Sequence, residues 1–118
     1  MGSNEVIIGY QAGRSSTAAG HASIGYTAGY SNTSGLGNTN LGYQAGYSNT
    51  TAADRTIVGY EAGEFSTGAA NTFLGLAAGK GTSGSSTGSY NTAIGKEAGL
   101  ALTSGGQNIL IGASAGDN

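Results

Sequence analysis

The chain contains no cysteine, no proline and no tryptophan, and only 8% of its 118 residues are charged. Without cysteine it can form no disulfide, no thiolate metal site and no cysteine nucleophile. The one histidine, His21, cannot form a cluster of imidazole ligands, and four lysines and arginines are too few for a basic surface. Nucleic acid is bound mainly through such a surface, so it is not an expected partner.

Long apolar runs are missing as well. No stretch approaches the roughly 18 apolar residues of a membrane-spanning helix, and the sequence does not open with a secretory signal. Proline is absent and glycine does not recur at every third position, which excludes a collagen helix. Met1-Gly2-Ser3 is typical of a remnant left by an expression vector, and we place these three residues outside the predicted domain.

Glycine, by contrast, is abundant, with 24 residues in a regular pattern. One phrase occurs seven times: a branched aliphatic residue, glycine, two variable residues, alanine and glycine. The first glycines of the copies, spaced 16, 17, 17, 16, 20 and 17 residues apart, are Gly9, Gly25, Gly42, Gly59, Gly75, Gly95 and Gly112. Such a composition is also typical of disorder, but a disordered chain needs no such register. The period predicts a single repeat domain of seven stacked coils over residues 4–118.

Each coil is predicted to consist of short β-strands and tight turns. β-Branched residues gather before the first glycine, as in Thr56-Ile57-Val58, and the paired glycines disfavour a helix. Coils stacked in parallel at about 4.8 Å would give an all-β, parallel β-solenoid (a β-roll or β-helix) about 34 Å tall. We expect the aliphatic residue before the first glycine and the recurring alanine to fill its interior.

Two further columns are candidates for contact with other subunits, because so thin a core leaves little surplus stability for a single chain. The residue after the first glycine is tyrosine in four coils: Tyr10, Tyr26, Tyr43 and Tyr60. The residue two positions before that glycine forms a patchy apolar row: Ile7, Ile57, Phe73 and Leu110. We expect at least one of these columns to be an intersubunit face. The alternative for the tyrosines is a solvated ladder stacked along the rod.

A third column carries hydroxyl groups eight residues after the first glycine and is expected on the surface. Its members are Thr17, Thr33, Thr50, Thr67 and Thr103, with Ser83 in the longest coil. This hydroxyl column supports an alternative function, a monomeric ice-binding solenoid. The longest coil carries about three extra residues in the loop 81–90, which is interpreted either as a tolerated surface loop or as a binding loop.

Catalytic chemistry is not expected from this sequence. His21 stands where other coils carry asparagine, four residues before the first glycine, so it is interpreted as a turn residue rather than a catalytic base. The segment 79–84 matches G-x-G-x-x-G, but no helix is expected after it, so nucleotide binding is not predicted. The acidic residues are scattered over different columns. The sequence therefore predicts no enzyme, no cofactor and no metal site.

Two runs carry a resemblance to known repeat families: Asn91-Thr92-Ala93-Ile94-Gly95 and the segment from Asn38 to Tyr47. The phrase Ile-Gly-x-x-Ala, preceded by Asn-Thr-x, resembles the head repeats of trimeric autotransporter adhesins and the repeats of phage tail fibres. The resemblance implies a left-handed parallel β-roll in a homotrimer, forming a shaft or head on a virion or bacterial cell surface, with a host glycan or receptor as partner. The phrase also resembles one hexapeptide unit of left-handed β-helix acyltransferases, which is the remaining alternative.

Overall fold

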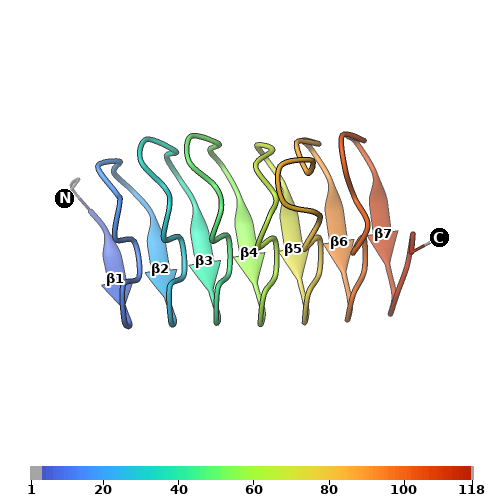
Figure 1. The fold of residues 1–118 in the computed structure, drawn as a ribbon, viewed down its shortest axis with the longest axis horizontal. Helices are drawn as coiled ribbons and strands as arrows, with labels where there is room; N and C mark the ends of the chain where they lie inside the picture. The colour runs from blue at the N-terminus through green and yellow to red at the C-terminus, as the bar shows by residue number, and fades with distance from the viewer. Residues whose placement is uncertain (1–3, 118) are drawn as a thin grey trace.

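The computed structural model describes residues 4–117, which form a parallel β-solenoid (Figure 1). Seven strands of three residues each make one sheet in sequence order. They are β1 (Val6–Ile8), β2 (Ala22–Ile24), β3 (Thr39–Leu41), β4 (Thr56–Val58), β5 (Thr72–Leu74), β6 (Thr92–Ile94) and β7 (Ile109–Ile111). Six connections join them, so the chain completes about six turns, with no helix between residues 4 and 117. The predicted all-β fold class is confirmed, whereas the expected vector remnant Met1-Gly2-Ser3 lies outside the described residues.

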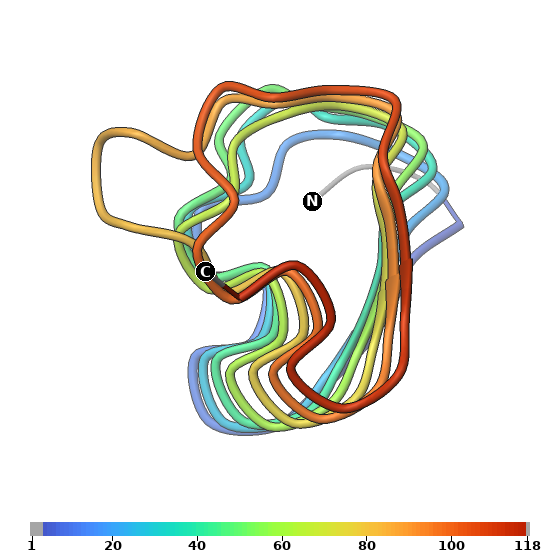
Figure 2. The same cartoon turned by 90° about the vertical axis from the view of Figure 1, so that its right-hand side faces the viewer.

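Equivalent residues of successive coils lie directly above one another. Ile24 of β2 is paired with Ile8 on one side and Leu41 on the other, and every strand pair is parallel in the same register. The molecule measures 40 × 21 × 21 Å, and along its long axis the turns nearly superpose (Figure 2). A single loop, residues 81–90, stands out from this common outline. Each column of the sequence pattern is therefore a straight row of side chains along the rod.

Glycine is required at the corner that follows each strand. Gly25 has a φ of +137°, and a β-carbon there would lie 2.5 Å from the carbonyl oxygen of Gly42 in the next coil. That separation is far below van der Waals contact, and the φ value is one that side chains rarely adopt. The first glycine of the repeated phrase thus allows the backbones of adjacent coils to pack against each other at the corner.

The middle residue of each strand, and not the aliphatic residue before the corner glycine, points into the solenoid. Ile57 and Phe73 are buried, whereas Ile8 is 59% and Leu74 46% exposed. The expectation that the aliphatic column fills the interior is therefore wrong. The row of Ile7, Ile57, Phe73 and Leu110, one of the two candidates for an intersubunit face, lines the interior instead, which leaves the tyrosine column as the other candidate. Side chains alternate between the two faces of a strand, so adjacent residues cannot both be internal.

The recurring alanine does lie inside, as predicted. Its side chain is buried in six coils, at Ala12, Ala28, Ala45, Ala62, Ala78 and Ala98. The cross-section of the solenoid explains the choice of residue. A β-carbon on the neighbouring Gly63 would already lie 3.1 to 3.3 Å from atoms of Phe73, Ile57 and Arg55, so the wall opposite the strands stands close to the strand side chains.

The interior changes character along the rod. From β4 to β6 the middle strand residues are apolar: Ile57, Phe73 and Ala93 pack among the alanines, with Leu102 and Leu110 against them. The polar residues buried in this half, such as Ser66, Asn71 and Asn91, lie outside the strands. In β2 and β3 the corresponding middle residues are the polar Ser23 and Asn40, and further polar side chains are buried in the first three coils. The buried polar residues of that region are Ser16, His21, Ser23, Thr27, Asn32, Asn38, Asn40 and Asn49. Apolar burial stabilises a fold more reliably than polar burial, so the two halves of the rod should differ in local stability.

We expect backbone amides of β5 and β6 to exchange with solvent at least about tenfold more slowly than those of β2 and β3. The two pairs lie at comparable distances from the two ends of the rod, so end fraying affects them similarly. Hydrogen exchange followed by NMR or mass spectrometry would measure the difference. Equal protection, or stronger protection of β2 and β3, would contradict the stabilising role assigned to the apolar half.

Candidate interaction surfaces

The outward side chains of the seven strands form a regular face, named here the outer sheet face. Its first row comes from the first residue of each strand: Val6, Ala22, Thr39, Thr56, Thr72, Thr92 and Ile109. Its second row comes from the third residue: Ile8, Ile24, Leu41, Val58, Leu74, Ile94 and Ile111. The second row is aliphatic throughout and is exposed or half-buried in every coil. A continuous apolar row of this kind on a rigid sheet is typical of a protein contact surface.

The tyrosines predicted as a contact or interface column form a stacked ladder on the surface. Ring centroids are 5.2 Å apart between Tyr10 and Tyr26, 5.4 Å between Tyr26 and Tyr43, and 4.8 Å between Tyr43 and Tyr60. The ring planes of neighbours differ by only 9° to 16°, and all four side chains are exposed. This set is named the tyrosine ladder. It lies two residues beyond the second row, on the other side of the corner glycine.

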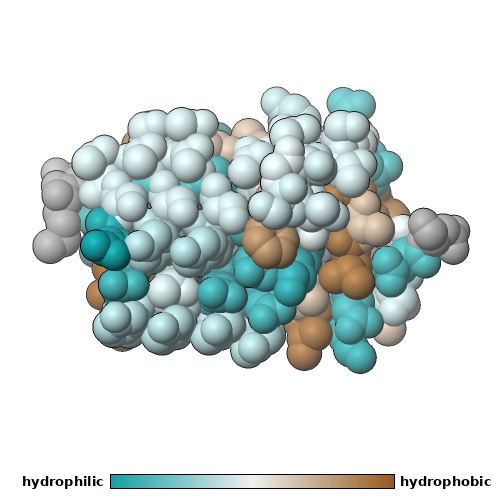
Figure 3. Space-filling model, viewed as in Figure 1, coloured by the Kyte–Doolittle hydropathy of each residue, from teal (hydrophilic) through white to brown (hydrophobic). Residues whose placement is uncertain are grey.

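A second, shorter aromatic stack has two members, each four residues after a tyrosine of the ladder. The rings of Tyr30 and Tyr47 are 5.0 Å apart, and both residues are half-buried. Nη1 of Arg14 donates a hydrogen bond of 2.8 Å to the hydroxyl of Tyr30, and the guanidinium lies over that ring at 5.6 Å. Figure 3 shows the side of the rod that lies opposite the sheet: its surface is largely pale in the coils of β1 to β3, whereas hydrophobic side chains gather in the coils of β5 and β6.

An ion-paired cluster continues this stack toward the middle of the rod. Nζ of Lys80 lies 2.6 Å from Oε2 of Glu61 and 3.1 Å from Oε2 of Glu64. The hydrogen bond to Glu61 raises the pKa of Lys80 above its ordinary value. Partial desolvation, followed by the charge of Glu61, raises the pKa of Tyr60 in the tyrosine ladder. Lys80 therefore stays charged at neutral pH, and it is already paired with two carboxylates.

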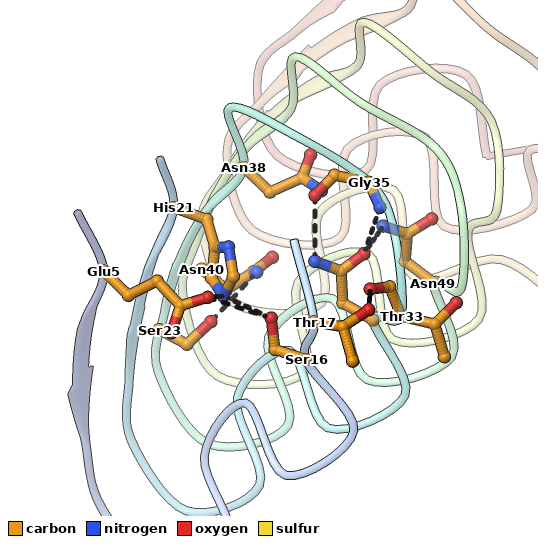
Figure 4. A network of polar contacts seen from close by, with 11 residues as sticks. Glu5, Ser16, Thr17, His21, Ser23, Thr33, Gly35, Asn38, Asn40 and Asn49 are labelled. Atoms are coloured by element: carbon orange, nitrogen blue, oxygen red, sulfur yellow. Dashed lines mark hydrogen bonds and ion pairs between the residues drawn. The ribbon is translucent and has the colours of Figure 1, made fainter. Parts of the chain in front are cut away.

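The hydroxyl column is exposed, but three of its hydroxyl groups are used within the fold. Thr17 donates to the carbonyl oxygen of Thr33 at 2.7 Å (Figure 4). Thr33 donates to the carbonyl oxygen of Thr50 at 3.0 Å. Thr67 makes the corresponding bond to Ser86 at 3.3 Å. Thr50 and Thr103 are also exposed. These threonines link successive coils through their hydroxyl protons, while their oxygens can still accept hydrogen bonds from outside.

The structure brings together three residues that could suggest a catalytic triad, and their geometry argues against it. Nε2 of His21 lies 3.0 Å from Oγ of Ser16 and 3.6 Å from Oε1 of Glu5, in the interior of the first coils (Figure 4). In a catalytic triad the carboxylate contacts the opposite ring nitrogen from the nucleophile. Here the same nitrogen faces both groups, and all three side chains are largely buried. The set is a buried polar cluster.

His21 occupies a column of asparagines that cap the turns, as its sequence position predicted. Nδ2 of Asn38 donates to the carbonyls of Gly35 and Ala52, and its Oδ1 accepts the backbone amide of Arg55 in the next coil. Asn71 repeats the pattern, accepting the amide of Asn91 at 2.8 Å. The column thus links each turn to the next one. The sequence analysis did not predict that Glu5, Ser16 and His21 contact one another. The available signal was their position in the repeat, because the equivalent residues of several other coils are also polar and buried.

Arg55 is the exception within this column. It is 1% exposed, and within residues 4–117 none of its three side-chain nitrogens has a hydrogen-bond partner. Its Nη2 would lie 3.3 Å from a β-carbon on Gly63, near Ile57 and Phe73 at the start of the apolar half. Desolvation by this burial lowers the pKa of Arg55 from its ordinary value to about 10. An unpaired buried cation is costly, so this position weakens the fold.

The loop 81–90 projects from the rod but is fixed at its base. Oγ of Ser86 accepts the backbone amide of Thr82 at 2.7 Å and donates to the carbonyl oxygen of Leu102 at 2.8 Å. Thr82, Ser83 and Ser85 are exposed. The G-x-G-x-x-G match over 79–84 belongs to this loop, and the chain after it turns into β6 (Thr92–Ile94) rather than a helix. A phosphate-binding helix terminus is therefore not formed here.

Other kinds of site were sought in the part of the chain that the structure describes. Over residues 4–117 there is no pocket and no group of three or more histidine, cysteine, aspartate or glutamate side chains that could hold a metal ion. None of the elements in that range is a helix long and apolar enough to cross a membrane. The interaction surfaces described above are thus the candidate functional sites.

Comparisons with protein-family models, with curated proteins and with solved structures found no match to this chain. The assignment that the coordinates support by themselves is a parallel β-solenoid of about six turns.

Proposed function

We propose that the chain is a structural and adhesive repeat module of a viral tail fibre or bacterial surface adhesin, and that it forms a rigid homotrimeric shaft or head. The observation that carries the proposal is the second row of the outer sheet face, in which seven aliphatic side chains stand in line on a rigid sheet. Ile8 and Ile111 are 59% and 67% exposed in the single chain. The resemblance of the repeated phrase to adhesin heads and tail fibres supports the trimer, the left-handed winding and a location on a virion or cell surface.

Burial of the second row would stabilise an assembly. Moving one aliphatic side chain from water into an apolar contact contributes about 1.5–3 kcal/mol. Another copy of the chain is a suitable partner, because its face has the same length and the same spacing of rungs. Threonines flank the row in β3 to β6 and would lie toward the margin, where polar groups are typical of interfaces. Self-association is therefore the simplest use of this face.

Adhesion would use the surfaces that remain outside. The oxygens of the hydroxyl column can accept hydrogen bonds from the hydroxyl groups of a host glycan or from a receptor. Each such contact is weak, but a rod that repeats it in every coil and every subunit multiplies the effect. We assign no enzymatic activity to the chain: the acyltransferases that share its phrase generally use a histidine at a subunit junction, and His21 is buried within its own chain.

The test of the proposal is the mass of the protein in solution. Light scattering should give about 34 kDa, the mass of three chains of 11.4 kDa each. The double substitution Leu41→Thr, Leu74→Thr places polar residues in the second row while keeping residues with high β-propensity, and it should shift the protein to 11.4 kDa.

The matched control is Leu36→Thr. Leu36 is 54% exposed but lies in a turn, outside the outer sheet face, so the same chemical change should leave the mass unchanged. A wild-type protein that stays at 11.4 kDa up to high concentration would overturn the assembly, and a mass of two chains would overturn the trimer.

The ice-binding alternative has one observation in its favour, and it concerns a different column from the predicted one. Thr39, Thr56, Thr72 and Thr92 form four consecutive rungs in the first row of a regular sheet. Thermal hysteresis from a monomeric protein, lost on substitution of Thr56 and Thr72 by bulky residues, would replace the structural proposal. Activity that depended on Thr17 and Thr33 instead would support the alternative in its original form.

A further inference from the structure

The tyrosine ladder shows only certain parts of its rings to solvent. Its four rings are nearly parallel and 4.8 to 5.4 Å apart, so the faces of the inner two are covered by their neighbours. The side chains are nevertheless exposed, with Tyr10 at 61% and Tyr26 at 48%. What remains accessible along the ladder is a row of ring edges, with further edges from the Tyr30 and Tyr47 stack in the same coils.

Ring edges select a particular kind of ligand. The edge of an aromatic ring carries partial positive charge and its face partial negative charge, so edges favour contact with the face of another aromatic system. Sugars present C–H groups, which favour ring faces, and the ladder hides most of these. A ligand that spans several rungs must also be long, flat and aligned with the rod, because the edges recur only in that direction.

From this geometry we propose that the tyrosine ladder is a binding site for an elongated, planar aromatic molecule, which lies along the rod and contacts several ring edges with one face. The site spans the first four coils, because the same column continues as Leu76 and Lys96 in the next two. It lies across the corner glycine from the second row of the outer sheet face, and the argument for it uses no part of the proposed assembly.

Thioflavin T, a flat, elongated, cationic aromatic molecule whose fluorescence rises when its internal rotation is restricted, is a suitable probe. We expect a saturable rise in fluorescence on titration of the wild-type protein. The double substitution Tyr26→Leu, Tyr43→Leu should weaken binding by at least about tenfold, because it removes the two central rings. Leucine already occupies this column at Leu76, so the fold should tolerate it, and circular dichroism would check that.

Tyr90 provides the matched control. It is 66% exposed and stands just before β6, outside the ladder, so Tyr90→Leu should leave binding unchanged. Dye binding that survives in the Tyr26 and Tyr43 variant would show that aromatic edges are not required, and would overturn the proposal. Absence of binding to the wild-type protein would do the same.

Two other results would reassign the site. Loss of dye binding in the Leu41→Thr, Leu74→Thr variant, with full binding in the tyrosine variant, would place the ligand on the outer sheet face. Displacement of the dye by cellohexaose, a neutral linear glycan, would make the ladder a carbohydrate surface. Either result overturns the proposal, whereas the mass of the protein bears only on the assembly.

Discussion

Substitution of Gly25 by alanine is expected to destabilise the protein by about 4 kcal/mol or more, a large effect for one methyl group. The new β-carbon would lie 2.5 Å from the carbonyl oxygen of Gly42, and this neighbour is backbone that cannot rotate away. The φ of +137° adds conformational strain, because L-residues with a side chain rarely adopt it. Chemical denaturation followed by circular dichroism would measure the loss.

Gly20→Ala separates the two contributions. Gly20 has a φ of +72°, but a β-carbon there would meet nothing within 4 Å. Its substitution should cost only about 1–2 kcal/mol, the strain of a left-handed residue without any clash. If Gly25→Ala were no worse than Gly20→Ala, the close approach of coils at the corner would not be a requirement of the fold.

Substitution of Arg55 by asparagine is expected to stabilise the protein by about 2 kcal/mol, which corresponds to roughly 8 °C in Tm. The lowered pKa of about 10 reflects the cost of holding the guanidinium away from water without a partner. Asparagine would continue the column of Asn38 and Asn71 and would supply a side-chain oxygen for the backbone amide of the next coil, as Asn38 does for Arg55. The smaller volume of asparagine leaves some space, which reduces the gain.

The effect of Arg55 should depend on pH in one direction. Its pKa of about 10 in the folded chain is lower than the ordinary value of an arginine, so the folded state binds this proton more weakly than the unfolded state. The destabilisation is therefore complete below pH 10 and is relieved as the pH rises toward that ordinary value. The difference in free energy of unfolding between Arg55→Asn and wild type should accordingly shrink over that interval.

Arg55→Lys is the control, because it keeps a buried cation and should give no stabilisation. Thermal melts of the three proteins at one concentration and at neutral pH would rank them. A variant with asparagine that melts below the wild type would mean that the guanidinium has a favourable partner in the folded protein, and the interpretation of Arg55 as a weak point would then be wrong.

The fold class could be predicted from the sequence alone, because the length of the repeat and the positions of its glycines are compatible with one kind of unit. Corner glycines at Gly9, Gly25 and their equivalents recur every 16 to 20 residues, too short a unit to be anything but one coil. Parallel stacking follows, since equivalent residues then meet equivalent residues in every pair, as Ile24 meets Leu41. The inward alanine was predictable for the same reason, because only a small side chain suits a narrow rod.

The interior row was not predictable with the same reasoning. A strand alternates sides with a period of two, and a shift by one residue exchanges the two faces completely. The third strand residue, for example Ile8 or Leu41, is aliphatic in every coil, and this predicted that it faces inward. The middle strand residue is polar at Ser23 and Asn40, and this predicted that it faces outward. The reverse holds: Ser23 and Asn40 are buried, and Nδ2 of Asn40 donates a hydrogen bond to Oγ of Ser23, which meets part of their need for partners inside.

The sequence by itself thus determined the coil, its period, the corners and the alignment of like residues, because each of these depends on local geometry repeated along the chain. The tertiary structure decided which side of each strand faces inward, and so it moved the aliphatic row to the surface and gathered Glu5, Ser16 and His21 in the interior. The direction in which the chain leaves each glycine corner fixes that choice. That direction depends on the contacts between neighbouring coils, and these contacts cannot be read from the sequence of one repeat.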